Sequence, residues 1–186
     1  MSTTHKMFTA TDVDEFVEML KEWPNCEAGP AEAAYSVSPF ICFYFTYEEG
    51  QALEASLALV DTHEAFEKLA GHPYTIGTHP ASERPHPYDS KRLPNLREYA
   101  TKKLNPNESF IFEATDEKNH GTSPATAGYF WRRRESYNRP DPTSGGVSYS
   151  YAQFYYRWQW WQDNREAWRG FVLDTIERLR PAQVYS

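Results

Sequence analysis

The sequence predicts an α+β fold, in which an antiparallel sheet of about four strands carries helices on one face as a two-layer sandwich. Two observations predict it. Segments with apolar residues at helical spacing alternate with segments rich in β-branched and aromatic residues. In the second half of the chain, three consecutive strand patterns are joined by polar connections, which is typical of an antiparallel meander. Because the chain has 186 residues and no internal repeat, we expect one domain over residues 1–186, with residues 1–10 as the segment most prone to disorder.

Four segments have the apolar spacing of amphipathic helices: Thr11–Trp23, Glu48–Ala70, Leu93–Leu104 and Asp163–Leu179. Thr11, Asn95 and Asp163 stand near the starts of three of them as candidate caps. Asp61–Glu64 has the form of a capping box, which indicates a kink or a break in the second helix. Gly170 weakens the last helix by roughly 1 kcal/mol relative to alanine, so we expect close packing there. The first helix carries an acidic outer face, which we interpret mainly as a solvated surface: Asp12, Glu15, Glu18 and Glu22.

Four segments have the composition of strands: Tyr35–Tyr47, Ser109–Thr115, Ala127–Arg134 and Val147–Trp160. Within the first, Phe40–Phe45 is apolar on both faces, so we expect it in the middle of the sheet. Pro39 then stands at the start of that strand or at a bulge. The polar segments 116–125 and 135–146 connect the last three strands.

Composition narrows the classes of function. No stretch approaches the ~18 continuous apolar residues of a membrane span, and the N-terminal segment lacks the basic and apolar blocks of a secretory signal. Cys26 and Cys42 have no metal-ligand spacing, which fits a reducing compartment. The net charge of −7 argues against nucleic-acid binding, which requires a basic surface, and suits a basic protein partner. We therefore expect a cytoplasmic protein that binds neither membranes nor nucleic acids.

The common catalytic motifs do not occur in the sequence. It has no nucleophile elbow, no P-loop, no dinucleotide-binding glycine pattern and no zinc-protease motif. Cys42 stands among phenylalanines, where burial raises the pKa of a thiol and makes it a poor nucleophile. We therefore favour a non-catalytic protein that needs no cofactor.

Three histidines, His72, His79 and His86, each precede a proline and follow one another at intervals of seven residues. Seven extended residues span on the order of 20 Å, so the three rings converge only if the loop folds back. No acidic residue or cysteine completes a recognisable ligand pattern around them. We expect a proline-stiffened surface loop over Gly71–Ser90 rather than a metal site, and long loops of this kind are often functional.

The densest positive cluster is formed by Arg132, Arg133 and Arg134. In a strand, Arg132 and Arg134 share one face and Arg133 lies on the other. The cluster could clamp a phosphate or a carboxylate, or it could pair across the sheet with an acid such as Glu113. We favour the pairing.

Eight of the thirteen residues from Tyr149 to Trp161 are aromatic. Alternation along a strand places one set under the helices, namely Ala152, Phe154, Tyr156, Trp158 and Trp160. The opposite face receives the second set, namely Tyr151, Gln153, Tyr155, Arg157 and Gln159. The preceding strand has the same split, with Phe130 on one side and Tyr129 and Trp131 on the other.

The second face is the candidate binding surface, because tyrosine, tryptophan and arginine are enriched at interface hot spots. The candidates for contact with a partner or a ligand are Tyr151, Tyr155, Arg157, Tyr129, Trp131 and Arg133. Three other interpretations stay open: a base-stacking platform, which the negative charge disfavours, a groove for a carbohydrate or small ligand, and simple core packing.

Four features follow one another along the chain: an aromatic strand running into a helix (FICFYFTYEEGQALEASLALV), a proline-rich middle, the strand GYFWRRR, and a last strand and helix ending at proline (YAQFYYRWQWWQDNREAWRGFVLDTIERLRP). This succession resembles the bacterial type VI secretion immunity family first described as a domain of unknown function (DUF3396, TsiV-like). The resemblance covers residues 35–181. It implies a non-catalytic cytoplasmic protein that binds a cognate effector toxin, commonly a nuclease, and blocks it.

The leading expectation is therefore an immunity protein, present as a monomer or a homodimer, whose partner is an effector toxin. An acidic protein suits a basic nuclease, because complementary charge speeds association. The aromatic face, the histidine-proline loop and the acidic first helix are the expected contact surface. The alternative is a small-ligand-binding protein or enzyme, in which the aromatic sheet lines a pocket.

Overall fold

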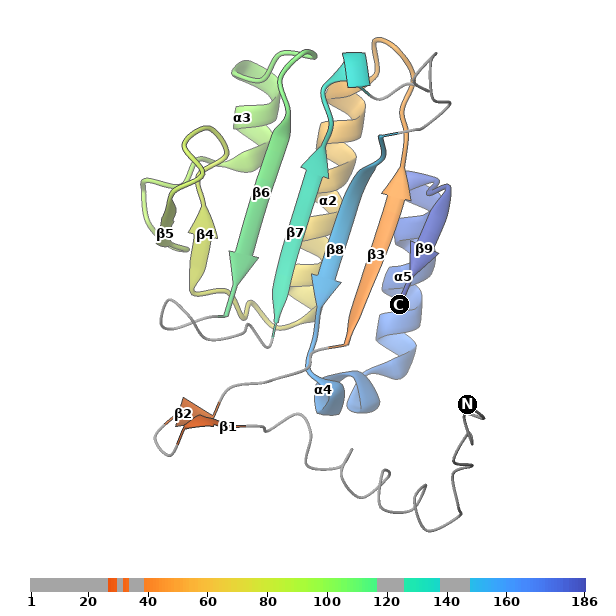
Figure 1. Cartoon of the computed structure of the whole chain (residues 1–186). Coiled ribbons are helices and arrows are strands. Elements are labelled where there is room, and N and C mark those ends of the chain that lie inside the picture. Colours follow the sequence, from red (N-terminus) through yellow and green to blue (C-terminus); the bar gives the residue numbers. More distant parts are fainter. Residues whose placement is uncertain (1–26, 30–31, 34–38, 117–125, 138–147) are drawn as a thin grey trace, which may run out of the picture.

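The computed structural model describes residues 27–29, 32–33, 39–116, 126–137 and 148–186. Within them, one antiparallel sheet has seven strands in the order β5-β4-β6-β7-β8-β3-β9 (Figure 1). The strands are β3 (Phe40–Phe45), β4 (Ile76–Thr78), β5 (Pro85–Pro87), β6 (Phe110–Thr115), β7 (Ala127–Arg132), β8 (Ser150–Tyr155) and β9 (Gln183–Tyr185). A separate two-stranded pair consists of β1 (Glu27–Gly29) and β2 (Glu32–Ala33).

The α+β class and the antiparallel sheet are confirmed, but the expectation of about four strands is wrong. The meander β6-β7-β8 forms as predicted, and β3 pairs with β8 on one side and β9 on the other. The additional strands β4, β5 and β9 have three residues each. So short a strand contains too few alternations to be recognised in the sequence. Two of them form a hairpin inside the segment that we expected to be an irregular loop.

Four α-helices lie within the described residues: α2 (Ala52–Leu69), α3 (Leu96–Lys102), α4 (Trp158–Asp163) and α5 (Arg165–Leu179). In Figure 1, α2, α3 and α5 lie behind the sheet and cover one of its faces. The core between the two layers is rich in phenylalanine, including Phe43, Phe66, Phe110, Phe130 and Phe154. The predicted two-layer arrangement is therefore observed, and the opposite face of the sheet carries no described helix.

Two details of the helices differ from expectation. α2 runs without a break through Asp61–Glu64, where the Asp61 and Glu64 carboxylates pair with the Arg97 guanidinium of α3 instead of capping a new helix. α5 begins after Asn164, so Asp163 does not cap it. Asn95 does cap α3, since its side chain accepts from the Glu98 N–H.

Gly170 is not a site of close packing. A Cβ atom added there would meet nothing within 4 Å. Tightly packed glycines occur in the sheet instead: at Gly128 in β7, a Cβ would lie 2.5 Å from the Tyr74 hydroxyl and 2.9 Å from Nδ1 of His63.

The aromatic run does not continue as a strand to Trp160. β8 ends at Tyr155, Arg157 precedes the first turn of α4, and the helix begins at Trp158. The two-residue alternation is therefore correct up to Tyr156 and fails afterwards. Trp158 is exposed rather than buried, whereas Trp160 reaches Phe66 and Trp168 from the helix.

Several sequence expectations fall outside the described residues. They are the expected disorder at residues 1–10, the expected helix Thr11–Trp23 with its acidic face, the expectation for Cys26, and most of the two expected polar connections, at residues 117–125 and 138–147.

Candidate functional site

The face of the sheet that no described helix covers carries a set of aromatic side chains, which we call the aromatic face: Tyr44, Tyr129, Trp131, Tyr149, Tyr151, Tyr155 and Tyr185. It is the face turned toward the viewer in Figure 1, opposite the helices. Strand alternation produces it, because the residues between these in β7 and β8, such as Phe130 and Phe154, point into the core.

Tyr151 lies at the centre of this face. Its ring centroid is 5.4 Å from that of Tyr129, 5.7 Å from that of Tyr44 and 6.1 Å from that of Trp131. Tyr44 extends the contacts to Tyr185 of β9 at 5.7 Å. At the other end of β8, Tyr155 contacts Phe40 at 5.9 Å, and its hydroxyl accepts from the Gln153 amide at 2.8 Å. Rings at these separations support one another, so the face is a continuous surface across four strands.

The hydroxyl groups of Tyr44 and Tyr151 are neutral at physiological pH. The hydrogen bond between the Tyr44 hydroxyl and the Cys42 thiol, together with burial, raises the pKa of Tyr44 to about 12. Burial, and then the hydrogen bond to Tyr129, raise the pKa of Tyr151. Neutral phenols can both donate and accept hydrogen bonds. The surface therefore offers broad apolar contact with polar tips, which suits a protein partner.

One cation joins this surface. The Arg133 guanidinium lies 3.5 Å from the centre of the Trp131 ring, a cation–π contact. Its Nε also donates to the Tyr149 carbonyl at 3.4 Å, which holds it against the sheet. Arg133 is thus held beside the tryptophan on the aromatic face.

Five of the six residues selected from the sequence come together here: Tyr129, Trp131, Arg133, Tyr151 and Tyr155. Arg157 does not, because β8 has ended before it, and its guanidinium pairs with the Asp116 carboxylate at 3.0 Å beyond the end of the strand. Gln159 lies in α4 and so also leaves the predicted face.

The sequence reasoning missed Tyr44 and Tyr185. Tyr44 alternates with the buried Phe43 and Phe45, and this signal was present, but the unbroken apolar run of β3 concealed it. Tyr185 belongs to the three-residue strand β9, which carried no recognisable pattern.

The arginine cluster has a different role from the one we favoured. Arg132 is fully buried, and its guanidinium donates to the carbonyls of Glu108 at 2.7 Å and Arg133 at 3.2 Å and to the Tyr47 hydroxyl at 2.9 Å. The register of the sheet places Glu113 opposite Tyr129 rather than opposite an arginine. Arg132 thus fastens the turn before β6 and the end of β3 to β7, while Arg134 stacks on Tyr137 at 4.0 Å.

A titratable cluster is buried under the sheet. His63 of α2 stacks on Tyr74 at 5.2 Å, and neither its Nδ1 nor the Tyr74 hydroxyl has a hydrogen-bond partner. Burial lowers the pKa of His63 to about 3, so the ring is neutral. Tyr88 donates to the Glu67 carboxylate at 2.8 Å nearby. None of these residues lines the described cavity, and we assign them to the core.

The three loop histidines do not converge. His72 pairs with Glu67 at 3.2 Å, His79 accepts from the N–H groups of Ala81 and Ser82, and His86 stands in β5. Within the described part of the chain, no group of three or more histidine, cysteine, aspartate or glutamate side chains could hold a metal ion.

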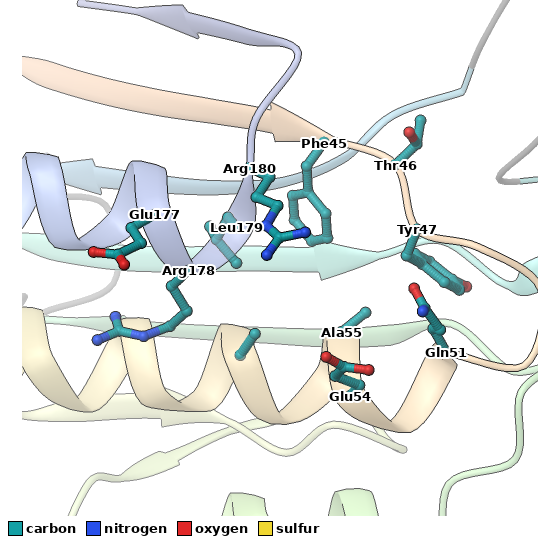
Figure 2. A pocket seen from close by; sticks show the side chains of 11 residues that line it. Phe45, Thr46, Tyr47, Gln51, Glu54, Ala55, Glu177, Arg178, Leu179 and Arg180 are labelled. Atoms are coloured by element: carbon teal, nitrogen blue, oxygen red, sulfur yellow. The ribbon is translucent and has the colours of Figure 1, made fainter.

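A cavity of about 240 Å³ lies between α2, the end of α5 and the end of β3 (Figure 2). Apolar side chains from Phe45, Ala55 and Leu179 form part of its wall, and charged side chains surround it, namely Glu54, Glu177, Arg178 and Arg180. It lies on the helix side of the sheet, so it is not the aromatic-lined pocket that the alternative function requires.

Comparison with known proteins gives one informative result. No protein-family model matches the chain, and no curated protein matches it significantly in sequence. Among solved structures, the fold is similar to that of the Pseudomonas aeruginosa T6SS protein PA0821, with a TM-score of 0.68 and 19% identity. The similarity covers 93% of this chain and 48% of that one, so this chain spans about half the length of its structural neighbour. At this identity the likeness establishes a shared fold.

The described helices have one further property. None of them combines the length and the apolar character that a membrane-spanning helix requires.

Proposed function

We propose that this protein is a non-catalytic binding protein of a type VI secretion system, and that its aromatic face holds and neutralises an effector toxin. The observation that carries the proposal is the aromatic face itself, a contiguous surface of tyrosines, a tryptophan and a stacked arginine on the side of the sheet that no described helix covers. Such side chains are the ones that dominate the energetics of protein interfaces.

Two further observations support it. The fold is shared with a protein of the Pseudomonas type VI secretion system. The net charge of −7 suits a basic partner such as a nuclease, since opposite charge accelerates encounter and favours the correct orientation.

The chemistry of the face also favours a protein over a nucleic acid. Stacking platforms for single-stranded nucleic acids combine aromatic rings with a positively charged groove. Here Arg133 is the cation in contact with the described aromatic face, and Glu113 lies in the adjacent strand opposite Tyr129. This surface is too weakly positive to neutralise a phosphate backbone.

The direct functional test is protection from toxicity. The chain is co-expressed with the product of a toxin-like reading frame beside it in the source genome, and growth is measured. We expect the wild-type chain to restore growth and the double variant Tyr129→Ala/Tyr151→Ala to restore it poorly. Trp158→Ala is the matched control, because Trp158 is an exposed aromatic residue of α4 and does not belong to the aromatic face. Equal protection by both variants would argue against the face.

The alternative, a small-ligand-binding protein or enzyme, has less support. The cavity of about 240 Å³ is smaller than the roughly 300–1,000 Å³ of typical ligand sites. Glu54, Glu177, Arg178 and Arg180 make its rim strongly charged. If it binds a metabolite, Ala58→Trp should fill the cavity and abolish a ligand-induced rise in melting temperature without affecting protection from the toxin.

A further inference from the structure

The cavity between α2, the end of α5 and the end of β3 has an apolar floor. Core side chains form this floor, because Phe45, Ala55 and Leu179 are all buried. Ala55 and Ala58 lie three residues apart on one face of α2, and side chains this small leave the space open. The volume of about 240 Å³ corresponds to roughly eight water molecules, each with a share of ~30 Å³ in the liquid. The cavity therefore suits a molecule of about that many non-hydrogen atoms.

Tyr47 forms a fixed wall of this cavity. Its hydroxyl donates to the Arg133 carbonyl at 2.5 Å and accepts from the buried Arg132 guanidinium at 2.9 Å. These two bonds hold the ring beside the end of β7, and the polar side chains of Thr46 and Gln51 also line the cavity. Because this wall is in place before a ligand arrives, binding has a lower entropic cost.

Arg180 is held at the cavity by its backbone. It follows the last residue of α5 in the left-handed conformation, with φ 46° and ψ 55°, at a position that glycine usually takes. Its N–H donates to the Ile176 carbonyl at 2.9 Å, and two residues later the Ala182 N–H donates to the Tyr44 carbonyl at 2.8 Å. The turn is thus fastened to both α5 and β3. An arginine at this position brings a cation to the cavity where a glycine would bring none.

The charged side chains around the cavity are two acids and two bases, so their charges sum to zero: Glu54, Glu177, Arg178 and Arg180. Arg178 is engaged elsewhere, since its guanidinium donates to the Thr62 hydroxyl at 3.2 Å. In Figure 2 the Arg178 guanidinium points away from Arg180 and Glu54. Within the described part of the chain, the side chains of Arg180 and Glu54 form no ion pair or hydrogen bond, with each other or with a neighbour. A cation and an anion therefore flank the same apolar floor without neutralising each other.

This combination of charges selects one kind of ligand. A simple anion would be attracted by Arg180 and repelled by Glu54, and a simple cation would experience the reverse. A zwitterion satisfies both side chains, because its carboxylate accepts from the guanidinium and its ammonium group donates to the carboxylate. The apolar floor then favours a ligand with a small aliphatic side chain.

We propose that this cavity binds a zwitterionic molecule of the size of an aliphatic amino acid, with its carboxylate on Arg180, its ammonium group on Glu54 and its side chain against Phe45 and Leu179. The small volume and the charged rim, which disfavour a drug-sized ligand, are the features that favour such a molecule. This inference does not depend on the proposed binding of a toxin, because the cavity lies on the helix side of the sheet and the aromatic face on the other side.

The test is a titration of the full-length chain with glycine, L-alanine, L-valine and L-leucine, followed in amide NMR spectra at residues such as Ala55 and Leu179. We expect saturable shifts with at least one of these amino acids. The N-acetyl derivative of the tightest binder lacks the ammonium group and its amide derivative lacks the carboxylate, and each should bind at least tenfold more weakly. The absence of saturable shifts with all four amino acids would overturn the proposal, and so would equal binding of the two derivatives.

Variants of the rim assign the two charges. Arg180→Gln and Glu54→Gln change exposed side chains, and each should weaken binding of the tightest amino acid at least tenfold. Arg169→Gln is the matched control, because Arg169 is an exposed arginine of α5 that does not line the cavity, and it should bind like the wild type. Wild-type affinity in both rim variants would overturn the proposal. Weaker binding in these variants with unchanged protection from the toxin would support it and would separate the cavity from the aromatic face.

Discussion

Among single residues, His63 should make the clearest contribution to the dependence of folding stability on pH. Its pKa is lowered to about 3 by burial in the folded chain, whereas an exposed histidine of the unfolded chain titrates near ~6.5. Between these values the unfolded state takes up a proton that the folded state does not. The stability associated with a neutral His63 is therefore fully present above about pH 6.5 and is lost as the pH falls toward about 3.

This predicts a specific difference between the wild type and His63→Phe. Below the pKa of the unfolded histidine the slope approaches about 1.4 kcal/mol per pH unit, so between pH 6.5 and pH 5 the wild type should lose roughly 1.6 kcal/mol more of its unfolding free energy than the variant. Urea denaturation at both pH values measures it. The other histidines are common to both proteins and cancel in the comparison. If the unfolding free energies of the wild type and His63→Phe changed equally with pH, the fold would not be holding His63 neutral.

Arg132 is the second residue whose substitution should measurably lower the unfolding free energy. Its buried guanidinium satisfies carbonyl groups in the turn before β6 and at the end of β7, as well as the Tyr47 hydroxyl. Arg132→Met keeps much of the volume but leaves these acceptors buried and unpaired, which should cost about 3 kcal/mol or more. Arg132→Lys should recover a part of this, since an ammonium group cannot reproduce the planar fork. A loss below about 1 kcal/mol in chemical denaturation would refute the assignment.

At the scale of secondary-structure elements, replacing either of two glycines by alanine should change the stability of the protein, and in opposite directions. Gly128→Ala in β7 puts a Cβ against Tyr74 and His63 and should destabilise the protein by about 1–3 kcal/mol. Gly170→Ala in α5 meets nothing within 4 Å and should stabilise it by up to about 1 kcal/mol, because alanine favours a helix. Thermal unfolding of the two variants beside the wild type measures both effects. Shifts of the same sign would contradict this account of the packing.

The elements also show what the sequence could and could not predict. The strands β3, β6, β7 and β8 and the helices α2, α3 and α5 were predicted because each repeats its period several times. β4, β5 and β9 were not, because three residues cannot display a period and their pairing depends on distant strands. The transition from β8 to α4 was missed for a different reason. Tryptophan and tyrosine fill either kind of element, so the aromatic run gave no sign of where the strand becomes a helix.

The residues of the candidate site were predictable from the sequence only where they belong to a strand with a clear two-residue period. Alternation within β7 and β8 correctly brought Tyr129, Trp131, Tyr151 and Tyr155 to one face, because the period of two is a property of the backbone. Arg157 was misplaced since that period ends with the strand. The contributions of Tyr44 and Tyr185 required knowledge of which strand lies beside β8, and that information depends on tertiary pairing.

For the molecule as a whole, the arrangement of layers determines the proposed function. The described helices occupy one face of the sheet and bury the phenylalanine core, and none of them covers the other face, which carries the tyrosine, tryptophan and arginine side chains of the proposed binding surface (Figure 1).

The central claim is that the aromatic face binds the toxin, and the affinity of the two purified proteins tests it most directly. Isothermal titration should compare the wild type with Tyr129→Ala/Tyr151→Ala and with the control Trp158→Ala, after circular dichroism has confirmed that all three are folded. We predict that the double variant raises Kd at least a hundredfold, as expected for the loss of about 3 kcal/mol at an interface hot spot, while the control stays within a few-fold of the wild type. A folded double variant with wild-type affinity would contradict the claim.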